Sequence, residues 1–102
     1  MGRKFQHSKH VYPLPPEENF DTSAILKGMN SFAPDATTEF YGLLVVGRIG
    51  RRPLTRDTGV RVVIVGRQKE TDVLGFEWKD FTLGFLRDLE GVGQALEEQK
   101  ES

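Results

Sequence analysis

Two strand-like segments separated by a turn-rich loop constrain the fold most. Residues 60–68 alternate in polarity, with every second side chain from Val60 to Ile64 apolar, which is the period of a half-buried strand. Thr38–Ile49 is apolar on both faces, which is typical of a central strand. The loop 50–59 contains glycine, proline and aspartate, residues that favour turns. The two segments are therefore predicted to pair as an antiparallel hairpin.

Two helices and a further strand are predicted around this hairpin. Asp21 is a suitable helix N-cap, and apolar residues spaced by four and three predict a short helix over 22–30. A short strand is predicted over 73–77. After it the apolar period changes from two to 3.6, which predicts a long C-terminal helix over 79–98.

Trp78 and Phe81 are the first apolar residues that follow this helical spacing. We predict that both pack against the sheet and anchor the core. The fold class is predicted to be α+β, with a three- or four-stranded antiparallel sheet packed against a long C-terminal helix and a short N-terminal helix. A chain of 102 residues has the size of one domain, which we place at 17–102. Residues 1–16 are predicted to form a basic, proline-terminated arm or an edge strand.

The predicted sheet has more apolar surface than the chain can cover. The strand at 40–49 is apolar on both faces, and a chain this short cannot cover both with its own helices. We therefore expect a homodimer.

Positive charge is concentrated in one stretch of the chain. Residues 48–69 hold seven cations and a single acid, Asp57, which leaves a net charge of +6, whereas the whole chain carries −1. Six of the seven are arginines, whose planar guanidinium suits phosphate. A basic patch of this kind attracts polyanions. The predicted nucleic-acid-binding residues are Arg48, Arg51, Arg52, Arg56, Arg61, Arg67 and Lys69.

This pattern favours a small, non-catalytic protein that binds single-stranded DNA or RNA. The arginines of the hairpin and of one sheet face would hold phosphates, and Phe40 and Tyr41 would offer stacking surfaces for bases. One alternative is a protein-interaction or adaptor subunit whose basic hairpin docks on an acidic partner, and another is a small phage or accessory protein that modulates a larger machine. The charges could also guard an edge strand or pair with the acidic C-terminal helix.

No metal site, cofactor or catalytic centre is predicted. His7 and His10 are too few for a structural zinc site, even with Glu17 and Glu18 nearby, and the chain has no cysteine. The carboxylates form no acid–base arrangement, and no nucleophile or phosphate-loop motif is present. No apolar run is long enough to span a membrane, and residues 1–10 lack the apolar core of a signal peptide. We therefore expect an intracellular protein of the cytoplasm, nucleoid or nucleus.

Residues 38–98 resemble the PC4, Pur-alpha and Whirly group of nucleic-acid-binding proteins. The resemblance rests on arginine-rich strands followed by an apolar strand, Trp78-Lys-Asp-Phe81 and an amphipathic helix. It implies a curved antiparallel sheet followed by a helix, dimerisation, and single-stranded DNA or RNA held by basic and aromatic side chains of the sheet. It assigns that role to Arg48, Arg61 and Arg67. The group usually has four strands before the helix, so residues 4–12 would have to supply the fourth.

Overall fold

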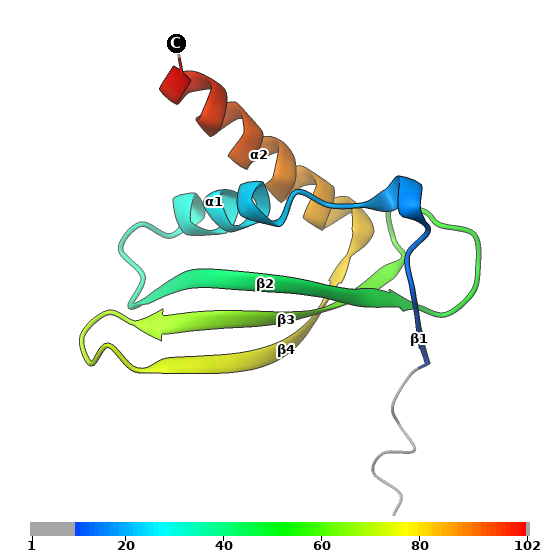
Figure 1. The fold of residues 1–102 in the computed structure, drawn as a ribbon, viewed down its shortest axis with the longest axis horizontal. Helices are drawn as coiled ribbons and strands as arrows, with labels where there is room; N and C mark the ends of the chain where they lie inside the picture. Colours follow the sequence, from blue (N-terminus) through cyan, green and yellow to red (C-terminus); the bar gives the residue numbers. More distant parts are fainter. Residues whose placement is uncertain (1–9, 102) are drawn as a thin grey trace, which may run out of the picture.

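The computed structural model describes residues 10–101 and has an α+β fold. Four strands form one antiparallel sheet in the order β1-β2-β3-β4, and both α-helices lie on the same side of it (Figure 1). This arrangement confirms the predicted fold class. The elements are β1 (Val11–Tyr12), the short 3-10 helix η2 (Pro16–Glu18), α1 (Thr22–Phe32), β2 (Thr38–Ile49), β3 (Gly59–Gln68), β4 (Leu74–Thr82) and α2 (Leu83–Glu101).

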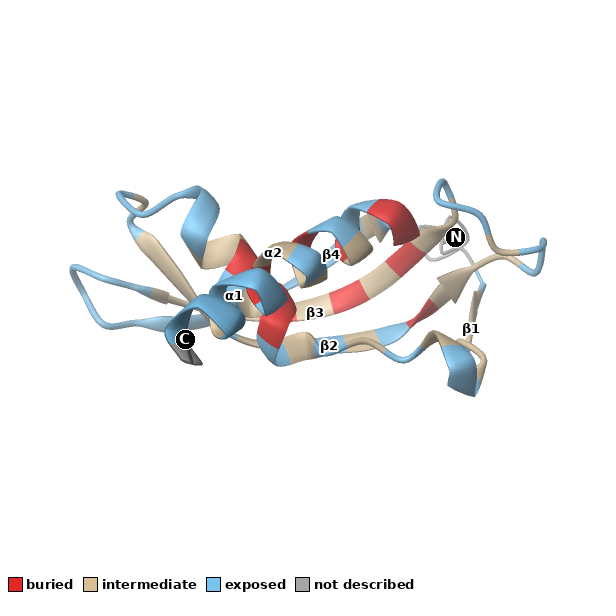
Figure 2. Cartoon of the chain, turned by 90° about the horizontal axis from the view of Figure 1, so that it is seen from above, coloured by how far each residue is buried: buried red, intermediate tan, exposed pale blue. Residues whose placement is uncertain are grey.

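The core lies between β3 and the two helices. Alternate residues of β3 are buried, as Figure 2 shows along that strand, whereas β4 is exposed over almost its whole length. Burial of an aliphatic side chain stabilises the fold by about 1.5–3 kcal/mol, so this small cluster supplies most of the hydrophobic stabilisation. Its buried members are Ile25, Val60, Val62, Ile64, Leu83, Leu86 and Leu89.

Two glycines allow the helices to pack at unusually short range. A Cβ atom at Gly93 of α2 would overlap the carbonyl oxygen of Ala24, and one at Gly28 of α1 would overlap that of Leu89. Glycine lowers helix propensity by about 1 kcal/mol, so from sequence Gly28 looks like a weak point of its helix. In the structure the missing side chains bring the two backbones together.

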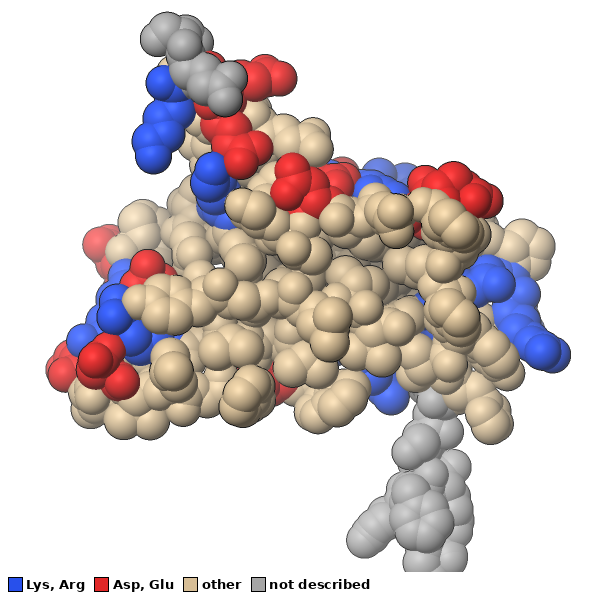
Figure 3. All heavy atoms as spheres, viewed as in Figure 1, with Lys and Arg blue, Asp and Glu red and all other residues tan. Residues whose placement is uncertain are grey.

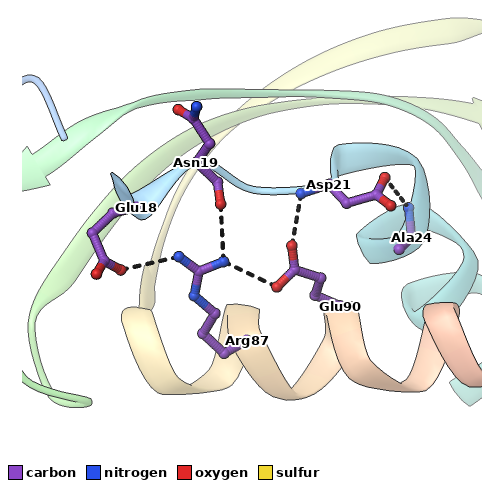
Figure 4. Close-up of polar contacts among 6 residues, drawn as sticks. All are labelled: Glu18, Asn19, Asp21, Ala24, Arg87 and Glu90. Carbon is purple, nitrogen blue, oxygen red and sulfur yellow. Dashed lines mark hydrogen bonds and ion pairs between the residues drawn. The ribbon is translucent and has the colours of Figure 1, made fainter. Parts of the chain in front are cut away.

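Polar contacts fix the chain entry into α1 against α2. The Asp21 carboxylate accepts a hydrogen bond from the Ala24 backbone N–H at 3.1 Å, which confirms the predicted N-cap. The Arg87 guanidinium donates to Glu18, to the Asn19 carbonyl and to Glu90, each within 3.0–3.1 Å (Figure 4). Burial lowers the pKa of Arg87, but the hydrogen bonds to Glu18 and Glu90, together with the negative charges of these two residues, raise the pKa above its usual value.

The strand β4 is longer, and α2 begins later, than the sequence pattern predicts. Residues 78–82 continue the strand, so Trp78 belongs to the sheet and not to a helix. The helix begins after Thr82, whose hydroxyl accepts a hydrogen bond from the Phe85 N–H at 3.1 Å. The prediction that Trp78 anchors the core is wrong because Trp78 is 66% exposed. Phe81 does pack against the core, from β4.

The N-terminal segment contributes a short edge strand. Val11 and Tyr12 pair with Ile49 and Arg48 of β2, so β1 is the fourth strand of the sheet. Residues 1–9 lie outside the described part of the chain, and with them most of the predicted arm. Neither α-helix of the described part combines the length and hydropathy that a membrane span needs.

Candidate nucleic-acid interface

The sheet has one face that neither helix covers. On β3, the residues that alternate with the buried ones project to this side. Residues paired across antiparallel strands share a face, so the β3 register identifies their neighbours on β2 and β4. We call this surface the open face. Its side chains include those of Glu39, Leu44, Arg61, Val63, Val65, Arg67, Leu74, Phe76, Trp78 and Asp80.

Large apolar side chains occupy the middle of the open face. Trp78 lies opposite Val63, and Val63 lies opposite Leu44. Phe76 is 79% exposed and Trp78 66% exposed, and Leu74 and Leu44 are also exposed. Single exposed apolar residues are common in proteins, but a contiguous group of this kind marks a binding surface.

Ion pairs neutralise both ends of the open face. The Arg61 guanidinium donates hydrogen bonds of 2.9 and 3.0 Å to the two oxygens of Asp80. At the other end, Arg67 contacts Glu39 at 2.8 Å and Asp72 at 3.1 Å. These hydrogen bonds to Asp80 and Glu39 raise the pKa values of the two arginines. Two of the predicted phosphate ligands are therefore already engaged with carboxylates.

Tyr41 adds an aromatic ring next to this surface. It lies at an irregularity in the pairing of β2 with β3, and the Arg67 guanidinium stacks 4.8 Å from the centre of its ring. Phe40, the other predicted stacking residue, is partly buried against the core, and its backbone N–H and C=O both bind the Asn30 side chain. Phe40 therefore lies on the helix side of the sheet, away from the open face.

The remaining arginines gather at the loop between β2 and β3. Arg48 lies opposite the buried Val60, on the helix side of the sheet, and so does not share a face with Arg61 and Arg67, the other two residues to which the family resemblance assigns nucleic-acid binding. Its guanidinium donates to the Arg52 carbonyl at 3.3 Å. The Arg51 guanidinium lies 5.0 Å from the centre of the Tyr12 ring. We call Arg48, Arg51 and Arg52 the arginine loop.

The arginine loop retains its positive charge. In the part of the chain that the structure describes, Arg48, Arg51 and Arg52 form no ion pair, whereas Arg56 contacts Asp88 of α2 at 2.8 Å. A hollow of about 490 Å³ opens beside the loop, and its lining includes Arg51, Arg52 and Thr55 together with the acidic residue Asp57. A hollow of this size is large enough for a phosphate group.

The basic stretch 48–69 is therefore divided between the two ends of the sheet. Figure 3 shows positive side chains at the end with the β2–β3 loop, and positive and negative side chains mixed at the opposite end. Lys69 lies at that opposite end, where its ammonium contacts the Pro34 carbonyl at 3.4 Å. The seven predicted cations do not form one continuous patch.

Sequence reasoning missed the most exposed residues of the open face. Leu74, Phe76 and Trp78 alternate with Gly75, Glu77 and Lys79, which is the period-two pattern of a half-apolar strand. That signal was available in the sequence. It was obscured because Trp78, Phe81 and Phe85 also fit helical spacing.

Within residues 10–101, no three or more His, Asp or Glu side chains are grouped closely enough to hold a metal ion. Of the two histidines considered for metal binding, His7 lies outside the described residues.

Comparison of the chain with protein-family models, with curated proteins and with solved structures found no match. The resemblance to the PC4, Pur-alpha and Whirly group therefore stays a prediction.

Proposed function

We propose that the protein binds single-stranded DNA or RNA without catalysing a reaction. In this proposal, bases stack on Phe76 and Trp78 of the open face, with Tyr41 as a further stacking surface, and phosphates contact the arginine loop. The observation that carries the proposal is the exposure of Trp78 and Phe76 on a sheet face without a helical cover. Stacking of a base on an aromatic side chain contributes about 1–3 kcal/mol and tolerates any base.

The distance between the aromatic residues of the open face and the arginine loop suits one bound nucleic-acid strand. Trp78 is paired with Val63 of β3. Val63 lies four residues along the strand from Gly59, the residue that follows the loop between β2 and β3. A strand advances about 3.3 Å per residue, so roughly 13 Å of sheet separates the Trp78 row from the loop. One extended nucleic-acid strand lying along β3 could reach both.

The arginines contribute unequally in this proposal. Arg51 and Arg52 of the arginine loop supply the main phosphate contacts, because they are exposed and have no carboxylate partner among the described residues, whereas Arg48 lies on the helix side of the sheet. Arg56, Arg61 and Arg67 would have to exchange an existing ion pair for a phosphate. Lys69 is exposed at the far end of β3 and would contact only a longer strand.

The experiment is a titration of a fluorescently labelled single-stranded oligonucleotide, followed by anisotropy at low salt. We expect binding by the wild type and a loss of about 5-fold to 150-fold in affinity for Phe76→Ala and for Trp78→Ala. Phe32→Ala is the matched control, because Phe32 is 65% exposed but lies at the end of α1. Absence of binding by the wild type would refute the proposal.

A protein-interaction or adaptor role is the second candidate. Leu44 and Leu74 make part of the open face aliphatic, and aliphatic surface suits a protein partner better than nucleic acid. The arginine loop would then dock on an acidic surface of that partner. Chromatography on immobilised nucleic acid separates the candidates, because only the first predicts retention at low salt that is lost as salt increases.

The proposal also retains two expectations drawn from the sequence. The protein would act as a homodimer, and it would work inside the cell, in the cytoplasm, nucleoid or nucleus. It does not depend on the family resemblance. Absorbance of the purified protein at two ultraviolet wavelengths, about 260 and 280 nm, tests directly whether it copurifies with nucleic acid.

A further inference from the structure

The outer edge of β4 has no strand paired with it among the described residues. β4 is the last strand of the sheet, and its pairing with β3 runs from Leu74 to Thr82 without an irregularity. Residues 74–80 are all exposed, and the strand contains no proline. Within residues 10–101 no further strand covers this edge. Natural proteins usually shorten, bend or cover such an edge, because its unpaired N–H and C=O groups can pair with another strand.

We propose that two copies of the chain pair antiparallel along β4, with Trp78 of one copy opposite Trp78 of the second copy. Trp78 is the middle residue of β4, so this register is the one in which all nine residues of both strands overlap. It joins two four-stranded sheets into one of eight strands. The two-fold axis runs perpendicular to the sheet, which keeps all helices on one side.

Charge complementarity selects this register over its neighbours. Glu77 and Lys79 lie opposite the buried Ile64 and Val62, so both project to the helix side of β4, where they are exposed and contact each other at 3.6 Å within one chain. With Trp78 at the centre, Glu77 of each copy lies opposite Lys79 of the other, which gives two cross-strand ion pairs. Paired residues share a face, so one strand can shift along the other only in steps of two residues. A shift of two residues in one direction places Glu77 opposite Glu77, and a shift in the other direction places Lys79 opposite Lys79. Like charges directly opposite each other are unfavourable.

Pairing along the edge would leave the open face accessible. The two Trp78 rings would lie opposite each other at the centre of one joined face, and the Phe76 and Leu74 of each copy would extend from that centre in opposite directions, with an arginine loop toward each end. This consequence rests on the proposed function, because it doubles the surface for a single strand. A face-to-face dimer would instead bury the same aromatic rings and block that surface.

Charge reversal tests the pairing without altering the open face. Glu77→Lys places two like-charged lysine pairs across the interface, and Lys79→Glu places two like-charged glutamate pairs there. Each single variant should therefore be monomeric, near 11.5 kDa, at concentrations where the wild type has twice that mass by sedimentation equilibrium. An equimolar mixture of the two variants should form a heterodimer, and the double variant Glu77→Lys/Lys79→Glu should recover the homodimer.

The outcomes separate this inference from the proposed function. A monomeric wild type at several hundred micromolar would overturn the pairing, and so would single variants that stay dimeric, as a face-to-face dimer would. The nucleic-acid proposal is tested independently by oligonucleotide titration of the monomeric variants. Because Glu77→Lys and Lys79→Glu change the net charge in opposite directions, weaker binding by both relative to the wild type would reflect the loss of the second copy.

Discussion

Arg61 of β3 and Asp80 of β4 face each other across the sheet and share two hydrogen bonds, of 2.9 and 3.0 Å. Arg61 is only about a quarter exposed in this pair. A guanidinium held in this way is a poor phosphate ligand, because phosphate binding would require the loss of both hydrogen bonds. The positive charge available to a polyanion therefore lies elsewhere, at the loop between β2 and β3.

The double variant Arg51→Ala/Arg52→Ala should bind single-stranded oligonucleotide more weakly than Arg61→Ala does. Both loop arginines are exposed and lack a carboxylate partner among the described residues. Each lost phosphate contact should reduce the slope of log affinity against log salt by about 0.7. The measurement is anisotropy at several salt concentrations, with Arg61→Ala as the control. An equal loss in the two variants would contradict the assignment of phosphate contacts to the loop.

Trp78→Ala should leave thermal stability almost unchanged, whereas Phe81→Ala should lower it. Trp78 is exposed on the open face, and substitutions at such positions change the free energy of unfolding by about 0.5 kcal/mol or less. Phe81 packs against the core and against Phe85, with 5.5 Å between the ring centres, so its truncation should cost up to about 3 kcal/mol. Thermal unfolding followed by circular dichroism measures both. A large loss for Trp78→Ala would mean that its ring is covered in solution.

Gly93→Ala should destabilise the protein, and Gly91→Ala should stabilise it, although both lie in α2. An added methyl group at Gly93 would overlap the Ala24 carbonyl, so the helices would have to separate, at a cost of about 1–3 kcal/mol. A methyl group at Gly91 would meet no atom within 4 Å, and the gain in helix propensity is about 0.4–1 kcal/mol. Urea unfolding of the two variants provides the comparison. A stabilised Gly93→Ala would show that the close helix contact is absent.

Much of the architecture could be predicted from local patterns. The alternation of 60–68 and the apolar run of 38–49 correspond to β3 and β2 within a residue, because burial on a sheet imposes a period of two. Asp21 was identifiable as an N-cap because its side chain acts on a backbone N–H only three residues away. Features that depend on neighbouring residues were therefore accessible from the sequence.

The strand–helix junction at 78–82 was mispredicted because two periods overlap there. Trp78 and Phe81 fit a helical stripe that continues at Phe85, yet Trp78 also fits the period-two row that begins at Leu74. The hydroxyl of Thr82 accepts a hydrogen bond from the Phe85 N–H at the start of the helix, and a single threonine is a weak signal in a sequence.

Most of the candidate site could not be read from the sequence because it depends on register. Arg61 and Asp80 are 19 residues apart, and only the alignment of β3 with β4 brings them together. This alignment also places Trp78 on the open face, and the alignment of β2 with β3 places Phe40 on the helix side of the sheet. A cluster of cations in sequence therefore overstated the free positive charge of the sheet face.

The central claim is that bases stack on Trp78, and the fluorescence of this residue tests it most directly. Trp78 is the only tryptophan of the chain, so the tryptophan emission comes from this one position. Addition of an unlabelled single-stranded oligonucleotide at low salt should quench this emission in a saturable manner, and added salt should restore it. Unchanged emission throughout a titration in which anisotropy shows binding would contradict the claim and place the bound strand away from the open face.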